Sequence, residues 1–337
     1  MDVAITGIGA LTPAGPDADV SPERYLKDRK TMKYMDRLSK MAVRAAGQAL
    51  EDAGLDLARL DPYTVGVSMA VGHVAADLSD FVPVIASGRA PDGSFDAAAM
   101  GRSNRINPIA VFKTLSNIPV CNVSIALGFK GDNLILYPDA PQAARALEEA
   151  AWAIREGTAA VMLAGGVASG LDFLNLHRRA MLERISAKRL PPADGAVVLV
   201  LEDAAAARAR GARIRGRVRG TGFAGGTGAV YVAGPAAADV ARAVRMALDA
   251  AGASARDVAL VVDGAMVDAH RDAERAGLAE VDLRDRNFVS AATGDMSTAS
   301  FAYGVHVALA RLSVGQAGLV LAIGSQGDVA CTMVDRT

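Results

Sequence analysis

Short apolar runs that alternate with longer segments of helical period constrain the fold of this chain most. The runs expected to form buried strands are Val3–Ile8, Val65–Val71, Ala159–Ala164, Ala196–Leu201, Ala259–Val262, Phe288–Ala291, Gly318–Ile323 and Val329–Val334. The segments with apolar residues every three or four positions are Arg37–Leu55, Gln142–Glu156, Ala237–Ala251 and Thr298–Leu312. Strands that alternate with helices in this way predict an α/β chain with mostly buried sheets.

The same local pattern occurs twice along the chain and suggests an internal repeat. A helical segment ends at Ala53–Gly54 and is followed by an apolar strand, and the pattern returns at Ala251–Gly252. No Pro- or Gly-rich linker divides the chain cleanly between the two. The 337 residues suffice for about two domains of ~150 residues or for one duplicated unit.

Composition excludes several classes of protein. The 36 Lys and Arg residues balance 37 Asp and Glu residues, so nucleic acid and anionic membranes are not expected as partners. The longest apolar stretch, 158–171, is too short and too rich in glycine to span a membrane. With no basic segment at the N-terminus, no secretory signal is expected and the location is predicted to be cytoplasmic. Only Cys121 and Cys331 are present, which argues against a disulfide scaffold, and both are expected to be small buried residues.

Generic motif searches yield no cofactor or metal site. Gly220–Gly225 matches G-x-G-x-x-G, but residues typical of a turn and strand follow it where a dinucleotide-binding loop requires a helix. We expect His177 on a surface helix, His270 at the start of a surface helix and His306 in a core helix. Neither these three histidines nor His73 have the spacing of zinc ligands. No cofactor is therefore expected.

Motifs in sequence order resemble the β-ketoacyl synthase family. They are the opening strand and turn Val3–Gly15, the first long helix Asp36–Gly54, the stretch Asn107–Gly131, the segment Ala164–Gly166 and the strand and turn Leu201–Ile214. The resemblance implies a thiolase-like, five-layered αβαβα fold with two pseudo-symmetric halves. The expected boundaries of these ketosynthase-like halves are residues 1–205 and 206–337.

The resemblance also locates the family's reactive residues, which are a cysteine at a helix N-terminus and two histidines. Counting from the neighbouring motifs places Ala140 at the cysteine position, Ala265 at the first histidine and Thr298 at the second. A methyl group is not a nucleophile, and no histidine is left to assist decarboxylation. The resemblance thus implies a non-catalytic subunit similar to the chain length factors of polyketide and aryl-polyene systems, or of a fatty-acid-like system.

Such a subunit implies partners, and two other functions stay open. The implied partner is an active ketosynthase, or a second copy of the chain, and an acyl carrier protein is reached through the pair. One alternative is an acyltransferase or condensing enzyme with a non-standard nucleophile, for which Ser297 or Ser300 are candidates. The other is a homodimeric scaffold or binding protein. Gln142 is two residues away from the position at which glutamine replaces the cysteine in decarboxylating relatives, so that chemistry is not favoured.

The dimer contact is expected on a strand before the nucleophile position. In the resembling fold the segment Val120–Leu127 would form an edge strand that pairs across a two-fold axis. Its apolar residues Val120, Val123, Ile125 and Leu127 are the predicted interface. An unpaired edge of that character would invite aggregation, so a dimer is expected.

Overall fold

A single sheet runs through the whole molecule. The computed structural model describes residues 2–12, 15, 17–75, 78–105, 107–184, 189–225, 235–284, 286–290 and 294–337. The strands in these ranges are β1 (Val3–Leu11), β2 (Val65–Val71), β3 (Asn133–Leu136), β4 (Val161–Ser169), β5 (Asp194–Asp203), β6 (Gly216–Ala224), β7 (Val258–Val262), β8 (Asn287–Val289), β9 (Ala317–Ile323) and β10 (Val329–Asp335). Their order is β3-β2-β4-β5-β1-β6-β10-β9-β7-β8.

The strand order has an internal mirror, which confirms the two pseudo-symmetric halves. Read from the centre outward, β1-β5-β4-β2-β3 matches β6-β10-β9-β7-β8 element for element. The halves meet where Val3–Ile5 pairs antiparallel with Gly216–Val218. Because this junction is only three residue pairs long, the two half-sheets can face each other across a layer of helices.

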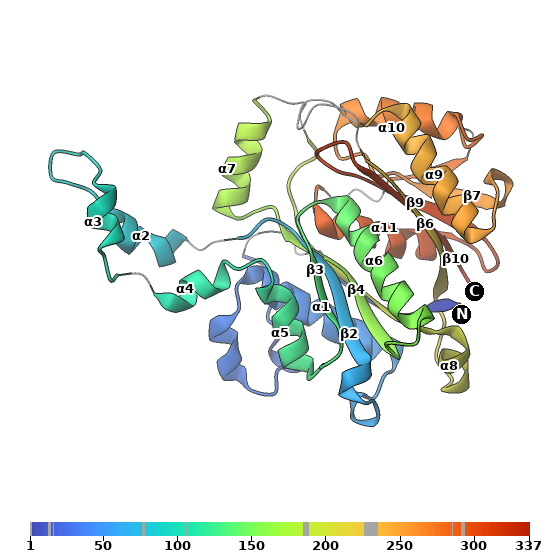
Figure 1. Ribbon diagram of the computed structural model, residues 1–337, viewed down its shortest axis with the longest axis horizontal. Coiled ribbons are helices and arrows are strands. Elements are labelled where there is room, and N and C mark those ends of the chain that lie inside the picture. The colour runs from blue at the N-terminus through green and yellow to red at the C-terminus, as the bar shows by residue number, and fades with distance from the viewer. Residues whose placement is uncertain are drawn as a thin grey trace.

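Helices fill the space between the half-sheets and cover their outer faces (Figure 1). The central layer holds α6 (Ala140–Arg155) and α11 (Thr298–Arg311), which pack against each other and against strands of both halves. The outer layers are α1 (Arg37–Ala53) with α5 (Ile118–Leu127) on one side and α9 (Ala237–Ala251) with α10 (Asp268–Ala279) on the other. The arrangement confirms the predicted five-layered αβαβα fold, with one apolar core around the central helices and one under each outer layer.

The repeat read from the sequence is confirmed in the capping of the outer helices. Gly54 ends α1 and Gly252 ends α9, both with φ 61°, a left-handed conformation that favours glycine. A short 3-10 turn and then a parallel strand, β2 or β7, follow each cap. The two halves therefore repeat the same helix–turn–strand unit.

Glycines let each outer helix lie directly on its half-sheet. A Cβ atom on Gly9 of β1 would lie 1.9 Å from the Ala45 carbonyl oxygen of α1. A Cβ atom on Gly222 of β6 would lie 2.1 Å from the Ala243 carbonyl oxygen of α9. The G-x-G-x-x-G sequence thus lies largely inside strand β6, where Gly220 and Gly222 allow close packing of α9.

The expected edge strand over Val120–Leu127 is wrong, because this segment is helix α5. Asn117 and Pro119 begin the helix, and Gly128 ends it with φ 83°. Val120 and Val123 are buried in the chain's own core and cannot form a surface for a partner, whereas Ile125 is 65% exposed and Leu127 is half-buried. The free edge of this half-sheet is β3, which pairs only with β2 among the described strands.

The remaining helices lie outside the five layers. They are α2 (Leu78–Ala86), α3 (Ala97–Gly101), α4 (Pro108–Lys113), α7 (Phe173–Leu182) and α8 (Ala204–Ala209). In Figure 1, α2, α3 and α4 extend away from the body as an arm. No helix among the described residues is both long and apolar enough to cross a membrane.

Residues with simple structural roles lie mostly as expected. Cys331 is buried in β10, but Cys121 lies half-buried on α5 rather than in a strand. His177 is exposed on α7 and His270 lies in the first turn of α10. His306 is half-buried on α11, and this burial lowers its pKa. The described residues include no cluster of three or more His, Cys, Asp or Glu side chains fit to hold a metal.

Candidate functional site

Ala140 stands at the N-terminus of the long central helix. It is the first residue of α6, and its backbone N–H donates to the Asp139 carboxylate at 2.8 Å. The dipole of a helix of this length stabilises negative charge at this end, as a thiolate nucleophile needs. The position suits a nucleophile, but the side chain is a methyl group that is only 2% exposed.

The other two predicted positions carry no reactive groups. Ala265 is buried in the loop after β7, between Gly264 and Met266. Thr298 is the first residue of α11, and its hydroxyl donates to the Val167 carbonyl at 2.8 Å. The donor capacity of this hydroxyl is therefore already used by the chain itself.

The cavity beside Ala140 is too small for a substrate. Gly264, Met266, Ser300 and Phe301 line it together with Ala140, and its volume is about 10 Å³. A single ordered water needs roughly 10–15 Å³ measured in this way. An acyl chain has no room here.

A buried carboxyl holds the loop that contains Ala265. The Gly264 N–H donates to Glu274 Oε1 of α10 at 2.7 Å. Burial raises the pKa of Glu274 to about 7, and the nearby carboxylate of Asp263 acts in the same direction. Glu274 was not singled out from the sequence, since a lone glutamate in a helix carries no motif.

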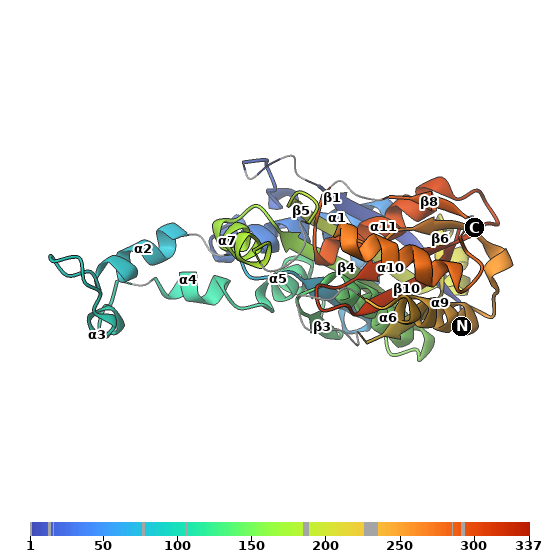
Figure 2. The same ribbon diagram turned by 90° about the horizontal axis from the view of Figure 1, so that it is seen from above.

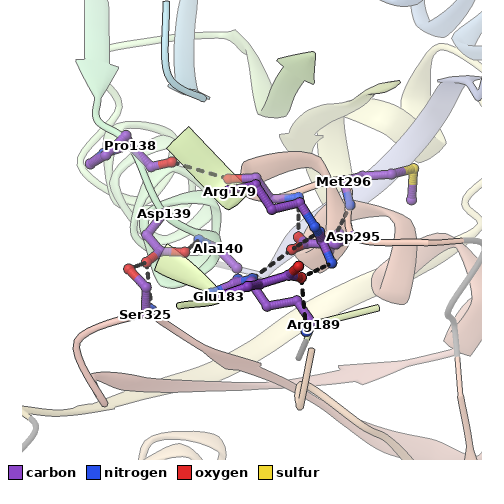
Figure 3. A network of polar contacts seen from close by, with 11 residues as sticks. Pro138, Asp139, Ala140, Arg179, Glu183, Arg189, Asp295, Met296 and Ser325 are labelled. Carbon is purple, nitrogen blue, oxygen red and sulfur yellow. Dashed lines mark hydrogen bonds and ion pairs between the residues drawn. The ribbon is translucent and has the colours of Figure 1, made fainter. Parts of the chain in front are cut away.

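Charged residues from distant segments meet above the helix terminus (Figure 3). Arg189 Nε donates to Asp295 Oδ2 at 2.8 Å, and Arg179 Nη1 lies 3.6 Å from the same oxygen. Arg179 Nη2 also pairs with Glu183 Oε1 at 2.8 Å. Burial lowers the pKa of Arg189, but the charge and hydrogen bond of Asp295, together with the charges of Asp139 and Glu183, raise it overall. The network ties α7 to the segment that precedes α11.

Arg179, Arg189 and Asp295 of this network line a pocket of about 100 Å³, called the approach pocket here, next to Asp139 and the start of α6. His73 enters the pocket with Nδ1 3.0 Å from the Tyr137 hydroxyl. Opposite, the Ser325 N–H and hydroxyl both donate to Asp139. Ion pairs thus line the approach pocket. They could not be predicted from sequence spacing, because the paired residues come from separate segments.

Ser297 and Ser300, the alternative nucleophiles, lie in different surroundings. Ser297 lines the approach pocket and caps α11 with φ 47° and ψ −120°, a strained conformation for a residue other than glycine. Its hydroxyl donates to the Pro138 carbonyl at 3.3 Å. Ser300 is buried, and its oxygen accepts from the Met296 N–H at 3.2 Å. Only Ser297 therefore lines the larger pocket.

His270 lies nearer to this site than the sequence indicated. Burial lowers its pKa, the charge of Arg189 lowers it further, and Asp139 partly offsets both. Both of these charged residues line the approach pocket. Gln142 lies half-buried in the first turn of α6.

Comparison with known proteins identifies the family. The model of the β-ketoacyl synthase N-terminal domain matches residues 17–233, more than half of the chain. The chain belongs to the β-ketoacyl synthase family.

Curated relatives are distant and longer. Nodulation protein E of Rhizobium meliloti is 28% identical over 263 residues, which are 74% of this chain and 60% of that protein. The 3-oxoacyl-[acyl-carrier-protein] synthase 2 of Staphylococcus aureus strain COL is 24% identical over 304 residues, 76% of this chain and 70% of that protein. The chain thus spans about 60% of the length of the first of these relatives.

Solved structures share the fold over the whole chain. A β-ketoacyl synthase from Burkholderia phymatum STM815 has a TM-score of 0.78 at 19% identity. The ishigamide ketosynthase/chain length factor has a TM-score of 0.78 at 18% identity. In both cases the match covers 100% of this chain and 99% of the other.

Proposed function

We propose that this chain is a non-catalytic subunit of the chain length factor type that pairs with an active ketosynthase. The observation that carries the proposal is Ala140, a methyl group at the helix N-terminus where the family's nucleophile belongs. A ketosynthase/chain length factor pair, the ishigamide one, is among the solved structures that share the fold, and it supports the proposal. The setting is polyketide, aryl-polyene or fatty-acid-like biosynthesis in the cytoplasm.

The chemistry of condensation supports the same assignment. Decarboxylation of a malonyl-thioester needs donors aimed at the oxyanion that develops. Ala265 offers no side-chain donor, and the Thr298 hydroxyl already donates to Val167. We assign no residue of this chain to catalysis and give that role to the partner's cysteine and histidines.

The partner contact is assigned to β3 in place of α5. Asn133 and Leu134 are exposed on this strand, and Tyr137 directly after it is 44% exposed. An unpaired edge strand is a template for another chain, and a strand of the partner would extend the sheet. An acyl carrier protein would then bind the pair through the ketosynthase.

We expect Leu134→Asp to abolish co-purification with a co-expressed, cysteine-bearing ketosynthase. A carboxylate on the paired edge would have to be buried without a partner. Val314→Asp is the matched control, since Val314 is 73% exposed in the turn between α11 and β9 of the other half. The measurement is the amount of ketosynthase retained by the tagged chain. Equal retention by both variants would contradict the β3 assignment.

A second candidate function is acyl transfer with Ser297 as the nucleophile. A hydroxyl in a strained backbone at a helix N-terminus, beside the approach pocket, is the observation that favours it. Among the described residues this hydroxyl donates to the carbonyl oxygen of Pro138, which is not a base that could activate it. Replacement by alanine would remove acyl labelling if Ser297 were the nucleophile.

The division of the chain into residues 1–205 and 206–337 also remains our proposal. Support comes from the mirrored strand order, in which β1 to β5 precede β6 to β10. The boundary would fall inside α8, the short helix that joins β5 to β6.

A further inference from the structure

A cleft of about 430 Å³, called the end cleft here, lies at the C-terminal end of α6. The polar side chains that line it are those of Asp2, Glu148, Arg155, Arg219 and Thr221. Figure 2 shows the N-terminus and α9 at the end of the molecule opposite the arm, and both contribute to this cleft. An α-helix rises about 1.5 Å per residue, so Arg155 lies about 22 Å along α6 from Ala140. The end cleft is therefore separate from the candidate site.

A β-bulge places an arginine at the wall of the end cleft. The register between β6 and β10 shifts at Arg219, so this residue has no partner on β10. Bulges of this kind redirect a side chain and are common beside functional sites. Arg219 is half-buried, and its Nη1 pairs with Asp335 at 2.8 Å.

The internal repeat shows that the fold does not require charge at this place. The matching bulge in β1 falls at Thr6, again directly before two glycines that pack against the outer helix. Thr6 is buried, and its hydroxyl donates to Glu202. Two residues further along each strand, Ile8 in β1 corresponds to Thr221 in β6. The second half thus has Arg219 where the first has a neutral side chain, and a hydroxyl where the first has an apolar group.

Arg155 contributes a positive charge that the chain does not neutralise. This arginine is the last residue of α6 and is half-buried. Among the described residues it forms no ion pair, and its Nη2 donates to the Val218 carbonyl at 3.4 Å. Glu148 in the same cleft pairs instead with Arg145, at 3.8 Å. Burial also raises the pKa of Glu148, which weakens this carboxyl as a counter-ion for Arg155.

The other carboxylates near the end cleft are already engaged. Asp2 pairs with Arg217 at 3.1 Å. Asp335 is shared, because it pairs with both Arg217 at 2.7 Å and Arg219 at 2.8 Å. One carboxylate thus serves two guanidinium groups, while Arg155 has none. Holding a half-buried charge without a counter-ion is unfavourable, and a bound anion would remove that cost.

We propose that the end cleft binds a small phosphate ester, with Arg155 and Arg219 as the residues that hold its phosphate group. A phosphate group carries about 1.5–2 negative charges near pH 7, and guanidinium groups match its oxygens with paired donors. Thr221 supplies a hydroxyl on the same wall. The volume lies within the ~300–1,000 Å³ typical of small-molecule sites, so the cleft has room for a polar body such as a sugar.

Isothermal titration calorimetry of the full chain at pH 7.5 and constant ionic strength tests the proposal. The probes are inorganic phosphate and ribose 5-phosphate. We expect one site per chain for each probe, with a dissociation constant of about 1 mM or lower, the range that a few charge-assisted hydrogen bonds supply. Ribose 5-phosphate should displace inorganic phosphate, because both would occupy the same site.

Three variants are expected to affect the binding of phosphate differently. Arg155→Gln should weaken it about tenfold or more, since a charged hydrogen-bond donor is lost. Glu148→Gln should tighten it, because a carboxylate that repels the anion is removed. Arg311→Gln is the matched control: Arg311 is the last residue of α11, is exposed and does not line the end cleft, so affinity should not change.

Four results would overturn the proposal. They are no saturable binding of inorganic phosphate to the unmutated chain, failure of ribose 5-phosphate to displace it, equal displacement by acetate, and unchanged affinity in Arg155→Gln. The first three measurements use the unmutated chain and decide the question even if a variant does not fold. None of them depends on whether the chain is catalytic.

Discussion

Gly222→Ala is expected to lower the free energy of unfolding by about 3 kcal/mol or more, the upper range for overpacked sites. The added Cβ atom would lie 2.1 Å from the Ala243 carbonyl oxygen and 2.7 Å from the Ala247 nitrogen. Both are backbone atoms of α9, so the whole helix would have to move from the sheet. Urea denaturation followed by circular dichroism measures the change.

Gly225→Ala in the same motif is the matched control. Among the residues that the structure describes, a Cβ atom there meets no atom within 4 Å, so we expect a change within about 0.5 kcal/mol. If both variants lost stability equally, close packing of α9 would not explain the motif. If Gly225→Ala removed binding of a dinucleotide, the packing interpretation would be wrong.

Glu274→Gln is expected to change how stability depends on pH, by about 3 kcal/mol across the titration. Glu274 has a usual pKa of 4.5 and a pKa of about 7 in the folded chain, chiefly because of burial. The folded state thus binds the proton more tightly than the unfolded state. The stability that this difference in Glu274 protonation contributes is fully present below pH 4.5 and is lost as the pH rises through 7. The Gln variant keeps an acceptor for the Gly264 N–H without this loss.

Urea titrations of both proteins at pH 5 and pH 8 measure the effect. Other titrating groups, His270 among them, are shared and cancel in the difference between the two proteins. The unmutated chain should lose stability relative to the variant as the pH rises. Parallel pH dependence in the two proteins would show that Glu274 does not titrate in this range.

Continuous apolar runs predicted most strands because these strands are buried on both faces, and helical periodicity predicted the main helices because each buries one face. Val65–Val71 and Ala237–Ala251 have the predicted bounds, and both lie within continuous cores. The predicted run Phe288–Ala291 begins within β8, and Ala291 lies outside the described residues. Helix ends capped by Gly54 and Gly252 were visible because a left-handed cap requires glycine.

The segment 118–127 was misread because its apolar residues are not confined to one face. Val120 and Val123 favour strands by propensity, but packing of α5 against α1 overrides that preference. The helix signals were present in Asn117, Pro119 and Gly128. β3 was missed because four half-exposed residues give too short a pattern.

The location of the candidate site could be predicted from the sequence, but the charged residues that surround it could not. Counting from family motifs placed Ala140 at a helix N-terminus, where the structure has it. The pairing of Arg179 and Arg189 with Asp295 depends on tertiary structure, because these residues are far apart in the chain. His270 was set aside for its distance in sequence, although the fold brings it near Asp139.

Intact-mass spectrometry of the purified chain after incubation with an acyl-thioester tests the central claim most directly. Because Ala140 offers no nucleophile and its cavity holds about 10 Å³, we predict an unchanged mass. An active ketosynthase treated in parallel should gain one acyl group. A stoichiometric adduct on this chain, mapped to Ser297 and lost in Ser297→Ala, would contradict the non-catalytic assignment.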